Sequence, residues 1–189
     1  FLVLAFIAIG LQGLTLFLAF FEPTLRYHIA KKPPFQLDSC EFCKLLASIA
    51  DTQVNTNSKV EVLTNGEQFY KAELEAIAHA KRSINLEAYI FQRGEVSRRF
   101  IQALAERARA GVKVNVVMDA IGSFLTTRGY CKELIEAGGN VEFYNPIRWY
   151  TLPRLNNRTH REMIIIDGEI GFIGGAGFAD HWFRNTRAG

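Results

Sequence analysis

The sequence predicts an α/β fold in which a mostly parallel sheet is flanked by helices and preceded by one transmembrane helix. Three observations support it: an uncharged apolar segment at the start, alternating strand and helix periods from residue 59 onward, and one later strand that is almost continuously apolar. The 189 residues therefore divide into a transmembrane helix at 1–21, a juxtamembrane linker at 22–58 and an α/β domain at 59–189.

The first 21 residues contain no charged side chain, and only Gln12 and Thr15 interrupt their apolar run. At about 1.5 Å per residue, a helix of this length crosses the roughly 30 Å apolar core of a bilayer. A signal peptide or a buried core helix would also be apolar, but a signal sequence has a shorter apolar region and a small-residue cleavage site. Three basic residues follow closely: Arg26, Lys31 and Lys32. By the positive-inside rule, we expect a single-pass protein of the cell membrane whose remaining chain is cytoplasmic.

The linker shows no sustained periodicity, apart from a short apolar stretch at 45–50 that predicts a short helix. Cys40 and Cys43 form a C-x-x-C pair within it. A zinc site needs four ligands, and Cys131 lies far along the chain without a second partner. We therefore expect reduced cytosolic thiols rather than a metal site.

Period-two and period-3.6 patterns alternate along the α/β domain. They predict, in order, a short strand opened by Val60 and Val62, a helix at 67–81, a strand at 84–91, a helix at 95–110, a strand at 112–118, a helix ending at Gly138-Gly139 and a strand at 141–144. The strand at 112–118 is almost continuously apolar, which predicts burial on both of its faces. Asn65-Gly66 is a turn signal before the first helix, and Gly111 is expected to end the second.

Two acidic residues lie where a parallel sheet collects ligands. Asp119 ends the strand at 112–118, and Glu87 projects from the strand at 84–91 on the face opposite to Leu86. In open α/β sheets, ligands bind at the carboxyl ends of the strands. Asp119 could equally cap the loop at Gly122-Ser123, and the sequence leaves both roles open.

The segment 159–182 carries the most informative pattern. Apolar runs at 163–166 and 169–173 are separated by Asp167-Gly168, which predicts a two-residue hairpin turn. Asp167 could therefore be only a turn residue. Because a strand repeats every two residues, His160 and Glu162 share a face that continues into the core, and Arg161 takes the opposite face.

The spacing from His160 to Asp167, followed by Gly174-Gly175, resembles the phospholipase D signature H-x-K-x-x-x-x-D with its small-residue pair. Neighbouring segments agree: NG at 65–66, INLEAYIF at 84–91, MDAIGS at 118–123 and NNRTHR at 156–161. Together they resemble the bacterial cardiolipin synthase branch of the phospholipase D superfamily, from about Val60 to the end of the chain. The resemblance implies a phospholipase D-like half-domain, the first and truncated half, whose second catalytic half comes from a missing C-terminal part or from a homodimer.

The resemblance also implies a function, that of a membrane-bound phosphatidyltransferase acting on phospholipid phosphodiesters through a phosphohistidine intermediate. His160 would be the nucleophile or its acid partner, with Asp167 supporting the imidazole. A neutral imidazole is a competent nucleophile near pH 7, so neither a metal nor a cofactor is expected. The other residues of the implied site are assigned to substrate binding: Glu87, Asp119, Gly174 and Gly175.

Glu162 occupies the position of the signature lysine, which holds the phosphate in the family. Unit charges ~4 Å apart interact by ~4 kcal/mol at an effective dielectric of ~20, so the exchange approaches ~8 kcal/mol before relaxation. We therefore predict impaired catalysis and expect Glu162→Lys to raise turnover. Protonation of Glu162, or an ion pair with Arg158, would soften the effect. Gly177 is a second departure, because many relatives carry a polar residue there.

Two other functions stay open: a membrane-tethered phosphodiesterase or nuclease completed by homodimerisation, and a non-catalytic remnant or lipid-binding scaffold. A net charge of +3 is too small and too dispersed to require nucleic acid, and it is compatible with anionic lipid. The helix at 95–110 carries both arginines and glutamates, which is typical of a solvated face. The remaining histidines show no metal-ligand spacing: His28, His79 and His181.

Overall fold

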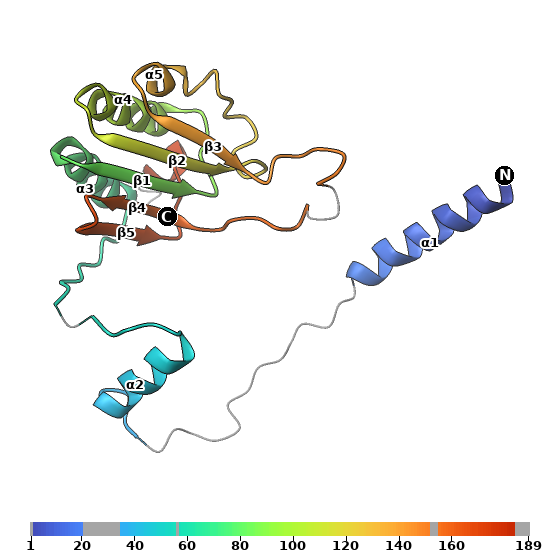
Figure 1. Ribbon diagram of the computed structural model, residues 1–189, viewed down its shortest axis with the longest axis horizontal. Coiled ribbons are helices and arrows are strands. Elements are labelled where there is room, and N and C mark those ends of the chain that lie inside the picture. Colours follow the sequence, from blue (N-terminus) through green and yellow to red (C-terminus); the bar gives the residue numbers. More distant parts are fainter. Residues whose placement is uncertain (1, 21–34, 56, 152–154, 184–189) are drawn as a thin grey trace, which may run out of the picture. The chain divides into compact units, whose positions relative to one another are not determined.

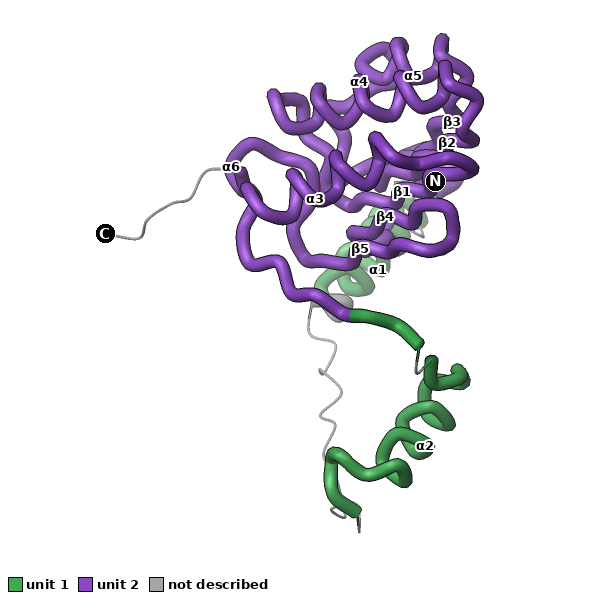
Figure 2. Tube along the Cα trace, turned by 90° about the vertical axis from the view of Figure 1, so that its left-hand side faces the viewer, with its two compact units in different colours: residues 1–59 green, residues 60–189 purple. Residues whose placement is uncertain are grey.

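The computed structural model of this protein describes residues 2–20, 35–55, 57–151 and 155–183. The chain forms two compact units, residues 1–59 and residues 60–189 (Figure 2). The first unit contains two helices, α1 (Leu2–Phe20) and α2 (Cys40–Ile49) (Figure 1). Ser39 caps α2, because its side chain accepts a hydrogen bond from Phe42 N at 3.2 Å. The short helix predicted at 45–50 is confirmed, and it begins earlier, at Cys40.

Helix α1 confirms that the apolar first segment is helical. Among the residues that the structure describes, no helix is long and apolar enough to cross a membrane. The ends of the predicted span, Phe1 and Phe21, lie outside the described residues, as do three basic residues used to orient it: Arg26, Lys31 and Lys32. The membrane span and its orientation therefore stay predictions.

The second unit is built on a five-stranded sheet in the order β3-β2-β1-β4-β5. Its strands are β1 (Ser83–Ala88), β2 (Lys113–Asp119), β3 (Asn140–Tyr144), β4 (Glu162–Ile166) and β5 (Ile170–Gly174). β1, β2 and β3 are parallel, whereas β4 is antiparallel to β1 and β5 is antiparallel to β4. The prediction of a mostly parallel sheet is thus corrected to a mixed sheet. A parallel neighbour needs a crossover to the other end of the sheet, and the connection from β3 enters β4 at the end where β3 finishes.

The helices of this unit are α3 (Gly66–His79), α4 (Glu95–Arg109), α5 (Lys132–Glu136) and α6 (Asp180–Phe183). Asn65 is the N-cap of α3, since its side chain accepts a hydrogen bond from Gln68 N at 3.2 Å. The Asn65-Gly66 pair therefore starts a helix rather than forming a separate turn. Gly111 follows α4 with a φ of 88°, in the left-handed region that glycine adopts easily, as expected for a residue that ends a helix.

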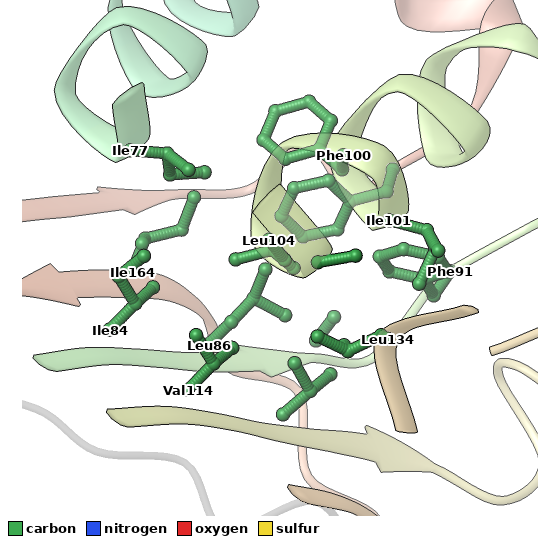
Figure 3. Close-up of a cluster of buried hydrophobic side chains, with 14 of the residues drawn as sticks. Ile77, Ile84, Leu86, Phe91, Phe100, Ile101, Leu104, Val114, Leu134 and Ile164 are labelled. Atoms are coloured by element: carbon green, nitrogen blue, oxygen red, sulfur yellow. The ribbon is translucent and has the colours of Figure 1, made fainter. Parts of the chain in front are cut away.

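The hydrophobic core lies between the helices and one face of the sheet. Ile84 and Leu86 of β1, Val114 of β2 and Ile164 of β4 point toward α3 and α4, where Ile77, Phe100 and Leu104 meet them (Figure 3). On the opposite face, the Asn115 side chain donates to Asn85 Oδ1 at 2.9 Å. β2 is therefore buried on one face only, which corrects the prediction of burial on both.

The strand predicted at Val60–Val62 is wrong. Val60 and Val62 are 84% and 81% exposed, and their backbone belongs to no strand. Flanked by Lys59 and Glu61, the two valines bury almost no apolar area, and a strand is stable only when it pairs with a neighbour.

The β4–β5 turn is held by Asp167. The predicted hairpin is confirmed, with Asp167 and Gly168 at φ angles of 56° and 71°, but its turn has three residues, 167–169, because Ile166 pairs with Ile170. The carboxylate accepts hydrogen bonds from the backbone N–H groups of the segment that leads into β1: Lys81 (2.9 Å), Arg82 (2.7 Å) and Ser83 (2.8 Å). These bonds, from Ser83 first, lower the pKa of Asp167.

We predict that Asp167→Asn lowers the thermal unfolding midpoint at pH 7, because an amide keeps one acceptor oxygen and loses the other. A lowered pKa stabilises the fold above the ordinary value of 3.8, and this stabilisation is lost as the pH falls through the folded-state pKa. Wild type and variant should therefore converge in acid, as measured by calorimetry from pH 7 to pH 2. A constant difference at every pH would contradict this role for the carboxylate.

Candidate active site

Asp119 organises the end of the sheet at which β1 and β2 finish. Its fully buried carboxylate accepts hydrogen bonds from Ile121 N (2.9 Å) and Gly122 N (3.1 Å), which fulfils the predicted capping role. It also accepts from Thr159 N at 3.1 Å and pairs with Arg158 at 3.3 Å. Asp119 thereby holds the segment just before His160. All these contacts are internal and suit a positioning role, and the expected substrate-binding role of Asp119 stays a prediction.

Glu87 holds the same segment from the face of the sheet that lies away from the core. Its Oε1 accepts a hydrogen bond from Thr159 Oγ1 at 2.5 Å and pairs with Arg161 at 3.4 Å. Thr159 is thus fixed twice, through its backbone amide by Asp119 and through its hydroxyl by Glu87. Glu87 lies on the face opposite to the alternate residues His160 and Glu162, so it too positions the segment and does not contact the imidazole. Thr159 was not singled out from the sequence, although strand alternation puts the residue before His160 on the same face as Glu87.

His160 itself is exposed at the start of β4. Its ring lies on the ring of Tyr89, with centroids 4.2 Å apart and planes inclined by 33°. Within the described part of the chain, no carboxylate hydrogen-bonds its ring nitrogens. An aromatic support of this kind fixes the plane of the imidazole while leaving both nitrogens open to a ligand.

The fold does not place Asp167 near His160. Seven residues of extended chain at ~3.3 Å each separate them by ~23 Å, and both oxygens of Asp167 are engaged at the far end of β4. The expectation that Asp167 supports the imidazole is therefore corrected, since Asp167 stabilises the hairpin turn. The sequence had left open that Asp167 is only a turn residue, and its contacts agree with that alternative.

Glu162 follows His160 on the same face and is buried, with 9% of its surface exposed. Its Oε1 accepts hydrogen bonds from Tyr89 N (3.1 Å) and Ile90 N (2.9 Å), whereas Oε2 is buried without a partner among the described residues. Burial raises the pKa of Glu162 to about 7, against the opposing effect of the two N–H donors. Arg158 pairs with Asp119 instead of Glu162. Of the two ways of softening its charge, protonation is the one these contacts favour.

A second acid, half-buried, interacts electrostatically with Glu162. Glu73 of α3 has an Oε2 without a partner among the described residues. Burial raises the pKa of Glu73 to about 8, and the charge of Glu162 adds to the effect. Near neutral pH the two carboxyl groups therefore carry less negative charge than two ordinary glutamates.

The glycines after β5 complete the site. Gly174 pairs with Glu162 across the β4–β5 ladder, so Gly174-Gly175 borders the start of β4. Beyond them, Phe178 N donates to Ile90 O at 2.8 Å. This contact presses Gly177 against its neighbours, because a Cβ there would lie 2.4 Å from Ile90 O and 2.8 Å from Glu162 Oε1. The two departures from the family signature, Glu162 and Gly177, are therefore in contact with each other.

Comparisons with known proteins agree with this geometry. Residues 74–187 match the family described as cardiolipin synthase, PLD-like domain. The chain is 36% identical over 148 residues to a cardiolipin synthase of Geobacillus kaustophilus, covering 76% of this chain and 29% of the relative. It is 37% identical over 127 residues to the major cardiolipin synthase ClsA of Bacillus subtilis, covering 67% of this chain and 26% of that protein. The chain thus spans less than a third of the length of these relatives.

Among solved structures, the chain resembles phosphatidylserine synthase from Haemophilus influenzae, with a TM-score of 0.53 and 20% identity. The likeness covers 65% of this chain and 29% of that protein. It identifies the fold as a phospholipase D-like α/β arrangement, with a mixed sheet flanked by helices.

The buried acids predict that stability falls as the pH rises. With folded-state pKa values of about 7 for Glu162 and about 8 for Glu73, above the ordinary 4.5, the folded state holds extra protons between these limits. Stabilisation is complete below pH 4.5 and is lost as the pH rises through 7 to 8. We expect Glu162→Gln to gain ~1–3 kcal/mol relative to wild type at pH 8 and nothing at pH 4, measured by urea unfolding. Glu75→Gln, on an exposed part of α3, is the control. It should leave the dependence of the unfolding free energy on pH unchanged.

Gly177→Ala should lower the free energy of unfolding by ~1–3 kcal/mol, because its Cβ would overlap the carbonyl oxygen of Ile90. Gly175→Ala provides a matched control two residues away, since nothing lies within 4 Å of a Cβ at that position. It should change stability by less than ~0.5 kcal/mol. Equal losses for both variants in urea unfolding would show that crowding at Gly177 is not the cause.

Proposed function

Because the chain belongs to the family of cardiolipin synthase phospholipase D-like domains, we propose that it supplies one half of a phosphatidyltransferase active site. His160 is the reacting imidazole. The observation that carries the proposal is the double attachment of Thr159, which holds the exposed His160 just before β4, near the Gly174-Gly175 pair. The donor is a phospholipid, and the acceptor is a second alcohol.

The reaction proceeds through a covalent intermediate. A ring nitrogen of His160 attacks phosphorus, the bond from phosphorus to the head-group oxygen breaks, and the departing alkoxide takes a proton from a second imidazole. That imidazole then removes the proton of the acceptor alcohol, which attacks the phosphohistidine and releases His160. Asp119 and Glu87 act through Thr159 by holding His160 in place, which reduces the entropy lost on reaching the reactive geometry.

The second imidazole comes from elsewhere. Since this chain covers less than a third of its curated relatives, a longer chain has room for another half-site. A second copy of the same half-domain would serve equally. The apolar segment 1–21 attaches the protein to the membrane as a single pass, with the α/β unit in the cytoplasm, so that the site meets its phospholipid at the bilayer.

Glu162 weakens the site without abolishing it. Its pKa of about 7 makes it largely neutral below that pH and anionic above it, where it repels the phosphate. We expect Glu162→Gln to raise transfer about tenfold at pH 8 and less at pH 6, because glutamine keeps the acceptor for Tyr89 N and Ile90 N. Glu162→Lys should raise transfer further at both pH values, provided the fold survives the loss of that acceptor. Glu169→Gln, on the exposed hairpin turn, is the control and should have no effect.

The decisive assay uses vesicles that contain phosphatidylglycerol labelled with ³²P. We expect labelled cardiolipin, together with a protein-bound label that is stable in base and lost in acid, and His160→Asn should remove both. His79→Asn is the matched control, because His79 is exposed on α3 and, among the described residues, its ring contacts Glu75 O of its own helix. Cleavage of single-stranded DNA that requires His160, without lipid transfer, would indicate the nuclease. Vesicle binding without either activity, in wild type and in Glu162→Lys, would indicate a non-catalytic lipid-binding scaffold.

A further inference from the structure

The connection between β3 and β4 contains a turn that is ordered without packing into the core. In this turn, Arg148–Thr151, Thr151 N donates to Arg148 O at 2.9 Å and Arg148 N donates to Thr151 Oγ1 at 2.8 Å. Thr151 Oγ1 also donates to Pro146 O at 2.9 Å. Figure 1 shows the part of the connection that directly follows β3 extending past the end of that strand. The turn therefore holds its shape while projecting its tip into solvent.

The tip displays two large aromatic side chains. Trp149 is 84% exposed and Tyr150 is 54% exposed, with ring centroids 5.5 Å apart. The neighbouring loop after β2 adds Phe124 and Leu125, which are 70% and 56% exposed. Phe124 lines one pocket together with Ile147 and Arg148, so the loop after β2 adjoins the start of the turn. Large apolar side chains that are exposed on two adjoining loops mark a candidate interaction surface.

A cation accompanies the aromatic rings. The Arg148 guanidinium lies 5.8 Å from the centroid of the Tyr150 ring, and its Nη1 donates to Tyr150 Oη at 2.5 Å. Among the described residues, Arg148 pairs with no carboxylate, whereas Arg128 at the same pocket pairs with Glu142. Tryptophan and tyrosine are enriched at the membrane–water interface, and arginine binds phosphate through several donors. The chemistry of the tip therefore fits the head-group region of a phospholipid bilayer.

The base of this connection is tied to the candidate site. Asn145 Nδ2 donates to Asn157 O at 3.0 Å, and Arg158 Nη2 donates to Asn145 O at 2.9 Å. Arg158 lies two residues before His160 and pairs with Asp119. The position of the turn and the position of the imidazole thus depend on the same contacts.

We propose that the Arg148–Thr151 turn, with Phe124 and Leu125, inserts into the head-group layer of a phospholipid bilayer and sets His160 at the depth of the lipid phosphates. The proposal deepens the proposed function and rests on it for the role of His160. A nucleic-acid surface would need several unpaired cations to neutralise phosphates, whereas this tip combines one such cation with apolar side chains. The bilayer is therefore the partner that matches both the apolar surface and the charge.

The chain offers its own probe, because it contains only two tryptophans, Trp149 and Trp182. Trp182 is half-buried and packs against the core, so Trp182→Phe leaves Trp149 as the sole reporter. The full chain is reconstituted in phosphatidylglycerol–phosphatidylcholine vesicles, with and without bromine on the acyl chains near the head group. We expect a blue-shifted emission that brominated lipid quenches about twofold, since Trp149 enters the interface. Emission typical of water with no quenching would overturn the proposal.

Three further variants separate insertion of Trp149 from nonspecific adsorption, from charge preference and from turnover. Trp149→Phe leaves Trp182 as reporter, and brominated lipid should leave the emission of Trp182 unchanged. Quenching of both tryptophans would mean nonspecific adsorption and would overturn the proposal. Arg148→Gln should remove the preference of Trp149 insertion for phosphatidylglycerol over pure phosphatidylcholine vesicles. The His160→Asn variant should be quenched as strongly as its parent. Insertion is thus measured without turnover, and a failure of the proposed transfer reaction would not be mistaken for a failure of docking.

Discussion

The carboxylate of Asp119 is the contact on which the functional end of the sheet depends. It lies at the end of a parallel strand, is fully buried, and joins the loop after β2 to the chain that enters the antiparallel strand β4. A buried charge is costly unless it is paired and hydrogen-bonded, and here Arg158 and three backbone N–H groups meet that requirement. The parallel and antiparallel parts of the sheet are therefore fixed relative to each other at the point where His160 emerges.

The exchange of lysine for Glu162 is accommodated by its surroundings. The carboxyl group accepts two backbone hydrogen bonds that a lysine could not accept, and Gly177 leaves room for it where any side chain would collide. Low dielectric surroundings then favour the neutral acid, so the electrostatic penalty for a bound phosphate depends on pH instead of being fixed. A family member with this pair of residues keeps the geometry of the site while changing its charge.

The alternation of β4 gives the site two kinds of residue. Thr159 and Arg161 face Glu87 on the side of the sheet away from the core, while His160 and Glu162 face the helix side, near Tyr89. The residues that hold the chain therefore lie on the opposite face from His160, the imidazole of the proposed reaction. This separation leaves the imidazole exposed while the preceding residue is held by two carboxylates, as the proposed role of His160 as nucleophile requires.

The sequence by itself determined the helices α3 and α4, the strands of the α/β unit, the hairpin at Asp167-Gly168 and the shared face of His160 and Glu162, because local periodicity and turn chemistry act over a few residues. It also identified the family through the spacing of His160 and Asp167. Only the tertiary structure decided that β4 runs antiparallel to β1, that Asp167 lies far from His160, and that Asp119 and Glu87 clamp Thr159. Those facts depend on which strands become neighbours and on which carboxylates become buried, and residues distant in sequence settle both.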